Sequence, residues 1–348
     1  MGMYETIQKL ENMRKKQNML RGVSFVVILF PFFSFMFMGD TFYQFSMLIP
    51  IFIFGGVIML SVVTNRISQE YKNLYKGTFV VDTLKACFDN TEYWWERGFN
   101  SDQVANFGLT QMGNRFSSED YLKGTYKGVD FEQADVTVKY KSSGKNSTTT
   151  IYFKGRMFAF DFPYKPVVSV QVFSSNFAYR GRTHTGFRTN KIEMESSHFN
   201  KKFDVKSVNE LDAFYVLTPH VMERIENLRS QFGNVAMHFC GKKLYVGINM
   251  TGNAFDGDLG RKIDYLTEQQ AVRADAKVIM DIIETLGMMK DEIPEEVQSD
   301  VKEEYSDTYN KEYEYDVDSD DYTDYGYNDS DLFDNQSTEN SIFKLKRY

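Results

Sequence analysis

The chain carries GVSFVVILFPFFSFMFMG at Gly22–Gly39 and TFYQFSMLIPIFIFGGVIMLSVVTN at Thr41–Asn65, two apolar runs that only Asp40 separates. An α-helix rises 1.5 Å per residue, so about 20 apolar residues cross the hydrocarbon core of a bilayer. Both runs are long enough and neither contains a charged residue. The pattern therefore predicts a transmembrane helical hairpin, with helices over 22–39 and 42–64.

Basic residues flank the outer ends of this pair and are absent from the connection between the runs. They are Lys9, Arg14, Lys15, Lys16 and Arg21 before the first run, and Arg66, Lys72 and Lys76 after the second. The positive-inside rule places such flanks in the cytoplasm. We therefore expect a multi-pass protein of the cell membrane, with both termini in the cytoplasm and the turn near 39–42 outside.

Three other interpretations of the apolar runs fit less well. A cleaved signal peptide would need a small-x-small cleavage site and a shorter apolar core, of about 7–15 residues. Two buried helices of a water-soluble core would show a polar stripe, but Phe and Met cover every face of these runs. Because no charged residue lies within either run, an ion pathway would need many assembled copies.

Charge is unevenly distributed along the chain. The net charge is −8, but residues 291–348 hold 19 acidic and 5 basic residues, a net charge of −14, whereas 1–290 carry +6. Nucleic-acid binding fits poorly, because the remainder is only mildly basic and the acidic segment would repel phosphate. Cys87 and Cys240 are the two cysteines, too few for a disulfide framework or a zinc site.

Between these ends the sequence predicts an α+β domain over 66–290. Apolar residues at helical spacing predict helices over 67–88, 219–232 and 268–286. Alternating residues around 136–140, 151–160 and 168–172, and a hairpin over 235–248, predict a mainly antiparallel sheet. Ser207 with Glu210 and Thr218 with Pro219 are typical of helix N-termini.

The domain boundaries follow from these patterns. We expect a basic cytoplasmic segment over 1–21, the hairpin over 22–65, the α+β domain over 66–290 and a tail over 291–348. The tail is rich in Asp, Glu, Tyr, Ser and Asn and has no apolar period. Such a composition buries too little apolar surface to offset the entropy of ordering the chain, so the tail is predicted to be disordered.

Several short motifs carry a family resemblance. They are Gly155-Arg156-Met157-Phe158, Phe160-Asp161, Glu195-Ser196-Ser197-His198-Phe199, Lys202-Phe203, Leu217-Thr218-Pro219, Met222-Glu223-Arg224 and Leu244-Tyr245-Val246. Residues of about 10–290 resemble a bacterial membrane family labelled domain of unknown function 3137. The resemblance implies two N-terminal spans before a cytoplasmic α+β domain. It implies no catalytic residues, because that family has no assigned chemistry.

No known catalytic, cofactor or metal signature stands in the chain. His238 and Cys240 share one face of an expected strand, but a metal needs three or four ligands and no third lies nearby. Asp256 and Asp258 lie in a calcium-loop-like stretch whose spacing fails at Asp264. We therefore expect no cofactor, no metal and no catalytic residue, and we do not expect an enzyme.

The best candidate site is a basic loop over 179–191, YRGRTHTGFRTNK. Its anion-binding candidates are Arg180, Arg182, His184, Arg188 and Lys191. Such a loop can hold a phosphate or a lipid headgroup. A plain solvated loop is the competing interpretation, and docking of the acidic tail on this basic surface is another.

The leading hypothesis is a membrane-anchored binding or scaffold module, with the acidic tail serving recruitment or self-regulation. The alternative is a membrane-surface enzyme or a binder of anionic ligands through 179–191. The partners expected are the lipid bilayer and a protein that contacts the tail or the domain surface, and no nucleic acid. Self-association into a homo-oligomer is left open.

Overall fold

The computed structural model describes residues 3–37, 49–162, 167–181, 189–257 and 260–289. The chain divides into two units, Met1–Lys302 and Glu303–Tyr348, and all described residues lie in the first. The predicted disordered tail over 291–348 therefore lies outside the described residues, as do Arg182, His184 and Arg188 of the basic loop.

Two long helices precede the sheet. They are α1 (Met3–Phe37) and α3 (Ile49–Tyr75), which contact each other. One π-helical turn, η1 (Lys76–Val80), and α4 (Val81–Cys87) continue directly from α3. The helix predicted over 67–88 is therefore present, with a π-helical turn inside it. Its buried residues include Tyr71, Tyr75 and Phe79, whose rings stack in sequence.

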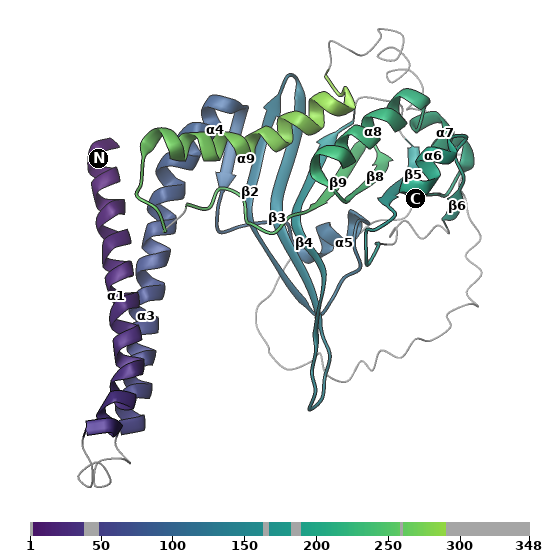
Figure 1. Cartoon of the computed structure of the whole chain (residues 1–348). Helices are drawn as coiled ribbons and strands as arrows, with labels where there is room; N and C mark the ends of the chain where they lie inside the picture. The colour runs from purple at the N-terminus through teal and green to yellow at the C-terminus, as the bar shows by residue number, and fades with distance from the viewer. Residues whose placement is uncertain (1–2, 38–48, 163–166, 182–188, 258–259, 290–348) are drawn as a thin grey trace, which may run out of the picture. The chain divides into compact units, whose positions relative to one another are not determined.

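Nine strands of the described chain form one antiparallel sheet, in the order β1-β2-β3-β4-β9-β8-β5-β7-β6. Their bounds are β1 (Asp89–Trp94), β2 (Arg115–Tyr126), β3 (Val129–Lys141), β4 (Thr149–Asp161), β5 (Val167–Ser174), β6 (Asn190–Ile192), β7 (Phe203–Ser207), β8 (Val235–Gly241) and β9 (Lys243–Asn249). The β3–β4 hairpin extends beyond the other strands (Figure 1). The antiparallel sheet predicted from residue alternation is confirmed.

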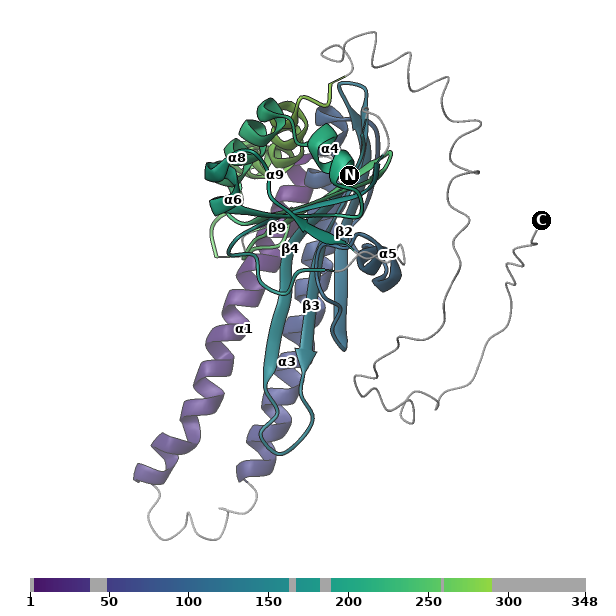
Figure 2. The ribbon, with the colours of Figure 1, turned by 90° about the vertical axis from the view of Figure 1, so that its right-hand side faces the viewer.

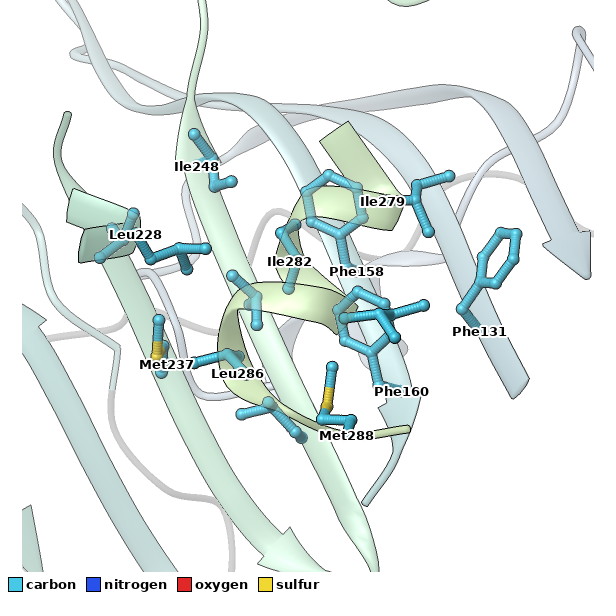
Figure 3. Packing of buried hydrophobic residues seen from close by; sticks show 14 of the residues in the cluster. Phe131, Phe158, Phe160, Leu228, Met237, Ile248, Ile279, Ile282, Leu286 and Met288 are labelled. Carbon is cyan, nitrogen blue, oxygen red and sulfur yellow. The ribbon is translucent and has the colours of Figure 1, made fainter. Parts of the chain in front are cut away.

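Helices cover one face of this sheet. They are α4, α6 (Ser197–Lys202), α7 (Glu210–Val216), α8 (Pro219–Phe232) and α9 (Tyr265–Leu286). The short helix α5 (Ser101–Asn106) lies on the opposite side of the sheet from α8 and α9 (Figure 2). The larger core lies beneath α9, where Ile279, Ile282 and Leu286 pack against Phe158 and Phe160 (Figure 3).

The helix boundaries show how far local sequence specifies local structure. Thr218 caps α8 by accepting a hydrogen bond from the Val221 amide, and Pro219 is its first residue. Gly287 ends α9 in the left-handed region, at φ 64°, where a Cβ would be strained. Ser207, however, does not cap α7. It ends β7, and Asn209 is the N-cap residue.

The predicted transmembrane hairpin is wrong for this structure. Helix α1 begins well before the first apolar run, and α3 continues beyond the second, to Tyr75. Among the described residues, no helix combines the length and apolar character that a membrane span requires. The predicted turn near 39–42 lies outside them.

A substitution in α9 measures how strongly the helix-covered face stabilises the fold. Ile283 is fully buried, whereas Leu266 in the same helix is 65% exposed. We expect Ile283→Ala to lower the free energy of unfolding by about 2–5 kcal/mol, through lost burial and the cavity left behind. Leu266→Ala is the control and should change it by less than about 0.5 kcal/mol. Urea unfolding followed by tryptophan fluorescence measures both, and equal midpoints for the two variants would contradict this packing.

Candidate functional site

The candidate basic loop is only partly described. Arg180 is engaged within the fold. Its Nη1 lies 2.7 Å from Asp204 Oδ2, its Nε and Nη2 donate to backbone carbonyls of Phe177 and Ser175, and its guanidinium lies over the Phe173 ring. Lys191, in contrast, is 64% exposed and 3.9 Å from Asp204. The structure thus brings two of the five candidates together around one carboxylate.

An open cleft lies on the face of the sheet opposite to α8 and α9. It has a volume of about 320 Å³ and is lined by residues of five adjacent strands, from β1 to β4 and β9. The residues lining it are Asn90, Glu92, Lys123, Gly124, Thr125, Asp130, Phe131, Glu132, Ala159, Asp161 and Lys243. The sheet supplies a rigid floor because each strand is hydrogen-bonded to the next.

Strand register arranges the charges of this cleft in a row. Glu92 lies opposite Lys123, and Lys123 lies opposite Glu132. Asp161 pairs with Lys243, and Asp130 accepts a hydrogen bond from the Thr125 hydroxyl at 2.6 Å. Four carboxylates and two ammonium groups line the cleft, so it is acidic overall and favours a cationic or mixed-charge ligand.

A network of buried charged groups lies on the other, helix-covered side. Lys76, the first residue of η1, is fully buried. Its Nζ lies 2.6 and 2.7 Å from the two carboxylate oxygens of Asp120 and 2.8 Å from Asp256 Oδ1. The Tyr93 hydroxyl donates to Asp120 at 2.5 Å. Burial raises the pKa of Asp120, while the Lys76 ammonium opposes that shift.

The backbone at Asp120 is unusual. Its φ is 59°, in the left-handed region, and the β2–β3 register shifts between Glu119 and Leu122. Such a bulge re-aims a side chain, and here it directs the carboxylate of Asp120 to Lys76. Strained backbone and π-helical turns are both enriched at functional sites. Both occur here on the two partners of one ion pair.

Arg156 holds the second half of the network. Its Nη2 lies 2.5 Å from Asp275 Oδ1, and its Nε lies 3.6 Å from Asp135 Oδ1, too far for a hydrogen bond. Asp135 Oδ1 has no hydrogen-bond partner among the described residues, while its Oδ2 accepts from the Ala254 amide. Burial raises the pKa of Asp135 to about 7, although Arg156 opposes the shift.

His238 forms a separate buried polar contact. Its Nδ1 lies 2.9 Å from the Phe107 carbonyl, which can only accept, so Nδ1 carries the proton and Nε2 accepts from the Ser169 hydroxyl at 2.9 Å. Burial lowers the pKa of His238 to about 4. Cys240 lies two residues along the same strand, and both histidine nitrogens are used within the fold. Within the described ranges, no three His, Cys, Asp or Glu side chains gather as a metal site would require.

Part of the chain matches the model of one known protein family. Residues 151–288 match the model of a family described as "Protein of unknown function (DUF3137)". The predicted family resemblance is confirmed over these residues. The match is narrower than the predicted 10–290 and says nothing about a membrane. No curated protein matches the chain significantly.

One solved structure is similar in part. It is the crystal structure of the mycobacterial trehalose monomycolate transport factor A, TtfA, with 10% sequence identity and a TM-score of 0.33. The similarity covers 60% of this chain and 95% of that chain. A similarity of this size supports no statement about function.

The DUF3137 match covers only part of the cleft and part of the buried network. It includes Arg156 and Asp275 of the buried network, but it excludes Lys76, Asp120 and Asp135. In the cleft it includes Asp161 and Lys243, but not Glu92 or Lys123. The family segment therefore supplies only part of each arrangement, including three of the eleven residues that line the cleft, and the preceding segments complete them.

Sequence reasoning missed the network because its members are far apart. Lys76 meets Asp120 across 44 positions, and Arg156 meets Asp275 across 119. One local signal was available, because Lys76 interrupts an otherwise apolar helical stripe between Tyr75 and Phe79. A charged residue within a buried stripe needs a buried partner.

The raised pKa of Asp135 gives a stability test. The folded protein holds the Asp135 proton up to about pH 7, whereas the unfolded chain releases it near its usual 3.8. The contribution of Asp135 to the free energy of unfolding is therefore fully present below about pH 4. It is lost as the pH rises to about 7, which lowers the free energy of unfolding by up to about 4 kcal/mol. The amide of Asp135→Asn does not titrate, so the stability of this variant relative to the wild type should rise over that range.

Urea unfolding at pH 4, 5.5, 7 and 8 measures this difference. Taking the difference between variant and wild type cancels the opposite effect of His238, whose lowered pKa costs stability as the pH falls below about 6.5. Asp102→Asn, at an exposed position, is the matched control and should follow the wild type. Parallel stability curves for Asp135→Asn and wild type would show that Asp135 is ionised in the fold.

Proposed function

We propose that this protein is a binding module that holds a protein partner in the open cleft of its sheet. The observation that carries the proposal is the cleft itself, about 320 Å³ in volume and lined by five hydrogen-bonded strands. A preformed polar concavity on a rigid sheet can bind with little loss of side-chain and loop entropy.

The charge pattern of the cleft defines the partner's chemistry. Glu92 and Glu132 stand on either side of Lys123, and Ala159, opposite Glu132, leaves little side chain beside these charges. A partner segment that presents arginine or lysine toward Glu92 and Glu132, and a carboxylate toward Lys123, complements this row. Such complementarity gives specificity and raises the association rate.

In this proposal the acidic tail over 291–348 serves recruitment or self-regulation. Its support is the net charge of −14 over 291–348, against +6 for the rest of the chain. Charge of one sign in a terminal segment is typical of an interaction tail.

Location at the cell membrane is a further proposal, and no described helix provides a span for it. Its support is apolar exposure on α1 and α3, where Phe25 is 65%, Phe54 73% and Val62 62% exposed. Exposed apolar side chains in groups mark contacts with a protein or a membrane. Flotation of the full chain with lipid vesicles tests it. If Phe25→Ser and Phe54→Ser left flotation unchanged, these side chains would have no part in it.

The alternative is a surface enzyme or a binder of anionic ligands through 179–191. Lys191 favours it, because this residue is largely exposed. Since Arg180 is held by Asp204 and two carbonyls, its replacement would disturb the fold. The sharper variant is Arg182→Ala with Arg188→Ala. Loss of binding to anionic vesicles would support this alternative, and unchanged binding would exclude it.

The cleft proposal is tested by photo-crosslinking in intact cells. A photoreactive residue at Thr125, which lines the cleft, should capture a protein neighbour. The same residue at Leu211, 75% exposed on α7, is the positional control. Because the partner is expected to be basic, Glu92→Gln with Glu132→Gln should reduce the capture at Thr125 about tenfold.

A matched charge control completes this experiment. Glu193 and Glu223 are exposed and lie outside the cleft. Glu193→Gln with Glu223→Gln makes the same charge change and should leave the capture unaltered. Equal capture at Thr125 and Leu211, or equal losses for the two double variants, would overturn the role of the cleft.

A further inference from the structure

A strongly basic surface lies at one end of strands β2, β3 and β4 and on the turn that joins the last two. We call it the basic face, and it consists of Arg115, Lys139, Lys141, Lys145 and Lys154. All of these residues are exposed except Lys139, which is partly buried. The sequence has no Asp or Glu between 103 and 118 or between 136 and 160. Positive charge is therefore concentrated here, although residues 1–290 carry a net charge of only +6.

Strand register places most of these charges on one side of the sheet. Arg115 lies opposite Lys139, and Thr137, two residues before Lys139, lies opposite Lys154. Side chains two residues apart on a strand share a face, so the three cations point to the same side. By the same alternation, Phe131 of β3 points to this side, where it lies in the core beneath α9. The helices thus cover this side at one end, and the basic face leaves it exposed at the other.

No carboxylate offsets the repulsion among these cations within the part of the chain that the structure describes. Like charges directly opposite each other on neighbouring strands destabilise a sheet. None of the five cations forms an ion pair with a described residue, whereas other surface lysines do, such as Lys72 with Glu119 and Lys277 with Asp281. A negatively charged surface brought against the basic face would relieve this repulsion.

Apolar and aromatic side chains stand among the cations. Ile151 lies opposite Lys139 and is 51% exposed. Tyr140, the next residue after Lys139, is 40% exposed, and its ring stacks on that of Tyr152 with 5.9 Å between the centroids. Tyrosine rings are enriched at the headgroup level of membranes, and lysine stems lie along apolar surface while their ammonium groups reach polar partners. Cations combined with exposed apolar side chains are typical of a surface that binds anionic lipids.

The shape of the hairpin suits a flat partner. The β3–β4 hairpin extends beyond the other strands (Figures 1 and 2), and its two strands pair as far as Lys141 and Thr149. The side chain of Asn114, which precedes β2, holds the Lys141 backbone by two hydrogen bonds of 2.8 Å, one to its carbonyl and one from its amide. A rigid, protruding hairpin can meet a flat bilayer without the bulk of the domain obstructing the contact.

We propose that the basic face binds the surface of an anionic lipid bilayer, its cations pairing with headgroup phosphates and Ile151 entering the headgroup layer. The contact is peripheral and needs no membrane-spanning helix. It uses a different surface from the cleft, and different residues from the apolar side chains of α1 and α3 that support the proposed location. Nucleic acid also offers phosphates, but it has no apolar layer for Ile151, and the net charge of +6 over 1–290 is low for a nucleic-acid binder.

Flotation of the full chain with phosphatidylcholine vesicles, with and without phosphatidylserine, tests this contact. We expect phosphatidylserine to increase binding, and about 0.5 M salt to abolish the increase because it screens exposed charges. Each basic residue close to an anionic membrane strengthens binding about fivefold. Lys139→Gln, Lys141→Gln and Lys154→Gln together should therefore lower the phosphatidylserine-dependent binding about a hundredfold. Apolar contact through α1 and α3 is common to both vesicles and cancels in the comparison.

A matched charge control uses exposed lysines elsewhere in the domain. Lys85→Gln, Lys201→Gln and Lys262→Gln make the same charge change at exposed positions outside the basic face. This triple variant should bind both vesicles as the wild type does. Equal losses for the two triple variants, or binding of the wild type that does not depend on phosphatidylserine, would overturn the proposal.

A second pair of variants tests the apolar part of the contact. Ile151→Ser should weaken the binding to phosphatidylserine vesicles about tenfold, because the exposed part of this side chain leaves water on binding. Leu211→Ser removes an apolar side chain that is 75% exposed on α7 and should have no effect. Equal binding by the two variants would contradict the insertion of Ile151.

Two further measurements separate this proposal from its rivals. Loss of vesicle binding in Arg182→Ala with Arg188→Ala, but not in the Lys139, Lys141 and Lys154 variant, would assign the lipid to the loop 179–191 and overturn the proposal. An oligonucleotide that displaces the vesicles through the same lysines and binds more tightly would show a nucleic-acid surface instead.

Failure of this proposal is distinguishable from failure of the proposed function. Photo-crosslinking at Thr125 in the cleft does not involve the basic face. Flotation through Phe25 and Phe54 does not require an anionic lipid, since those side chains are apolar. Each contact is therefore overturned by its own variants, and the loss of one leaves the others in place.

Discussion

The join between the long helices and the sheet depends on one buried ammonium group, that of Lys76. Lys76 has no exposed surface, and an unpaired charge in such a place would cost several kcal/mol. Two carboxylates, Asp120 and Asp256, pair with this ammonium. The left-handed backbone and the bulge at Asp120 direct its carboxylate toward Lys76. Because Lys76 stands where α3 passes into η1, this pairing fixes the end of the long helix against β2 and the loop before α9.

The neighbouring half of the network is less completely satisfied. Arg156 has a close partner in Asp275, but its Nε and Asp135 Oδ1 are 3.6 Å apart and unbonded among the described residues. A buried carboxyl in that position holds its proton to a higher pH, since ionisation would add a poorly compensated charge. The join between the long helices and the sheet is therefore coupled to a group that titrates near neutrality.

The surfaces distribute charge differently from the interior. Buried cations are paired, whereas the cleft has a surplus of carboxylates and the far end of the β3–β4 hairpin has cations without described partners. Surface charge is inexpensive to leave unpaired because water solvates it, so an imbalance of one sign on a rigid strand surface is available for recognition. The two surfaces are opposite in sign, which suits different partners for each.

Local patterns in the sequence determined the elements whose signals are local. Thr218-Pro219 began α8, Gly287 ended α9, and residue alternation placed the hairpin of β8 and β9, because caps, turns and side-chain periods act over a few residues. The apolar runs at 22–65 predicted a transmembrane hairpin, but no helix of the described residues is long and apolar enough to cross a membrane. Only the tertiary structure brought Lys76 to Asp120 and Arg156 to Asp275, and aligned Glu92, Lys123 and Glu132 across three strands. Those meetings depend on strand order and register, which the energy of the whole packed sheet selects and no short stretch of sequence encodes.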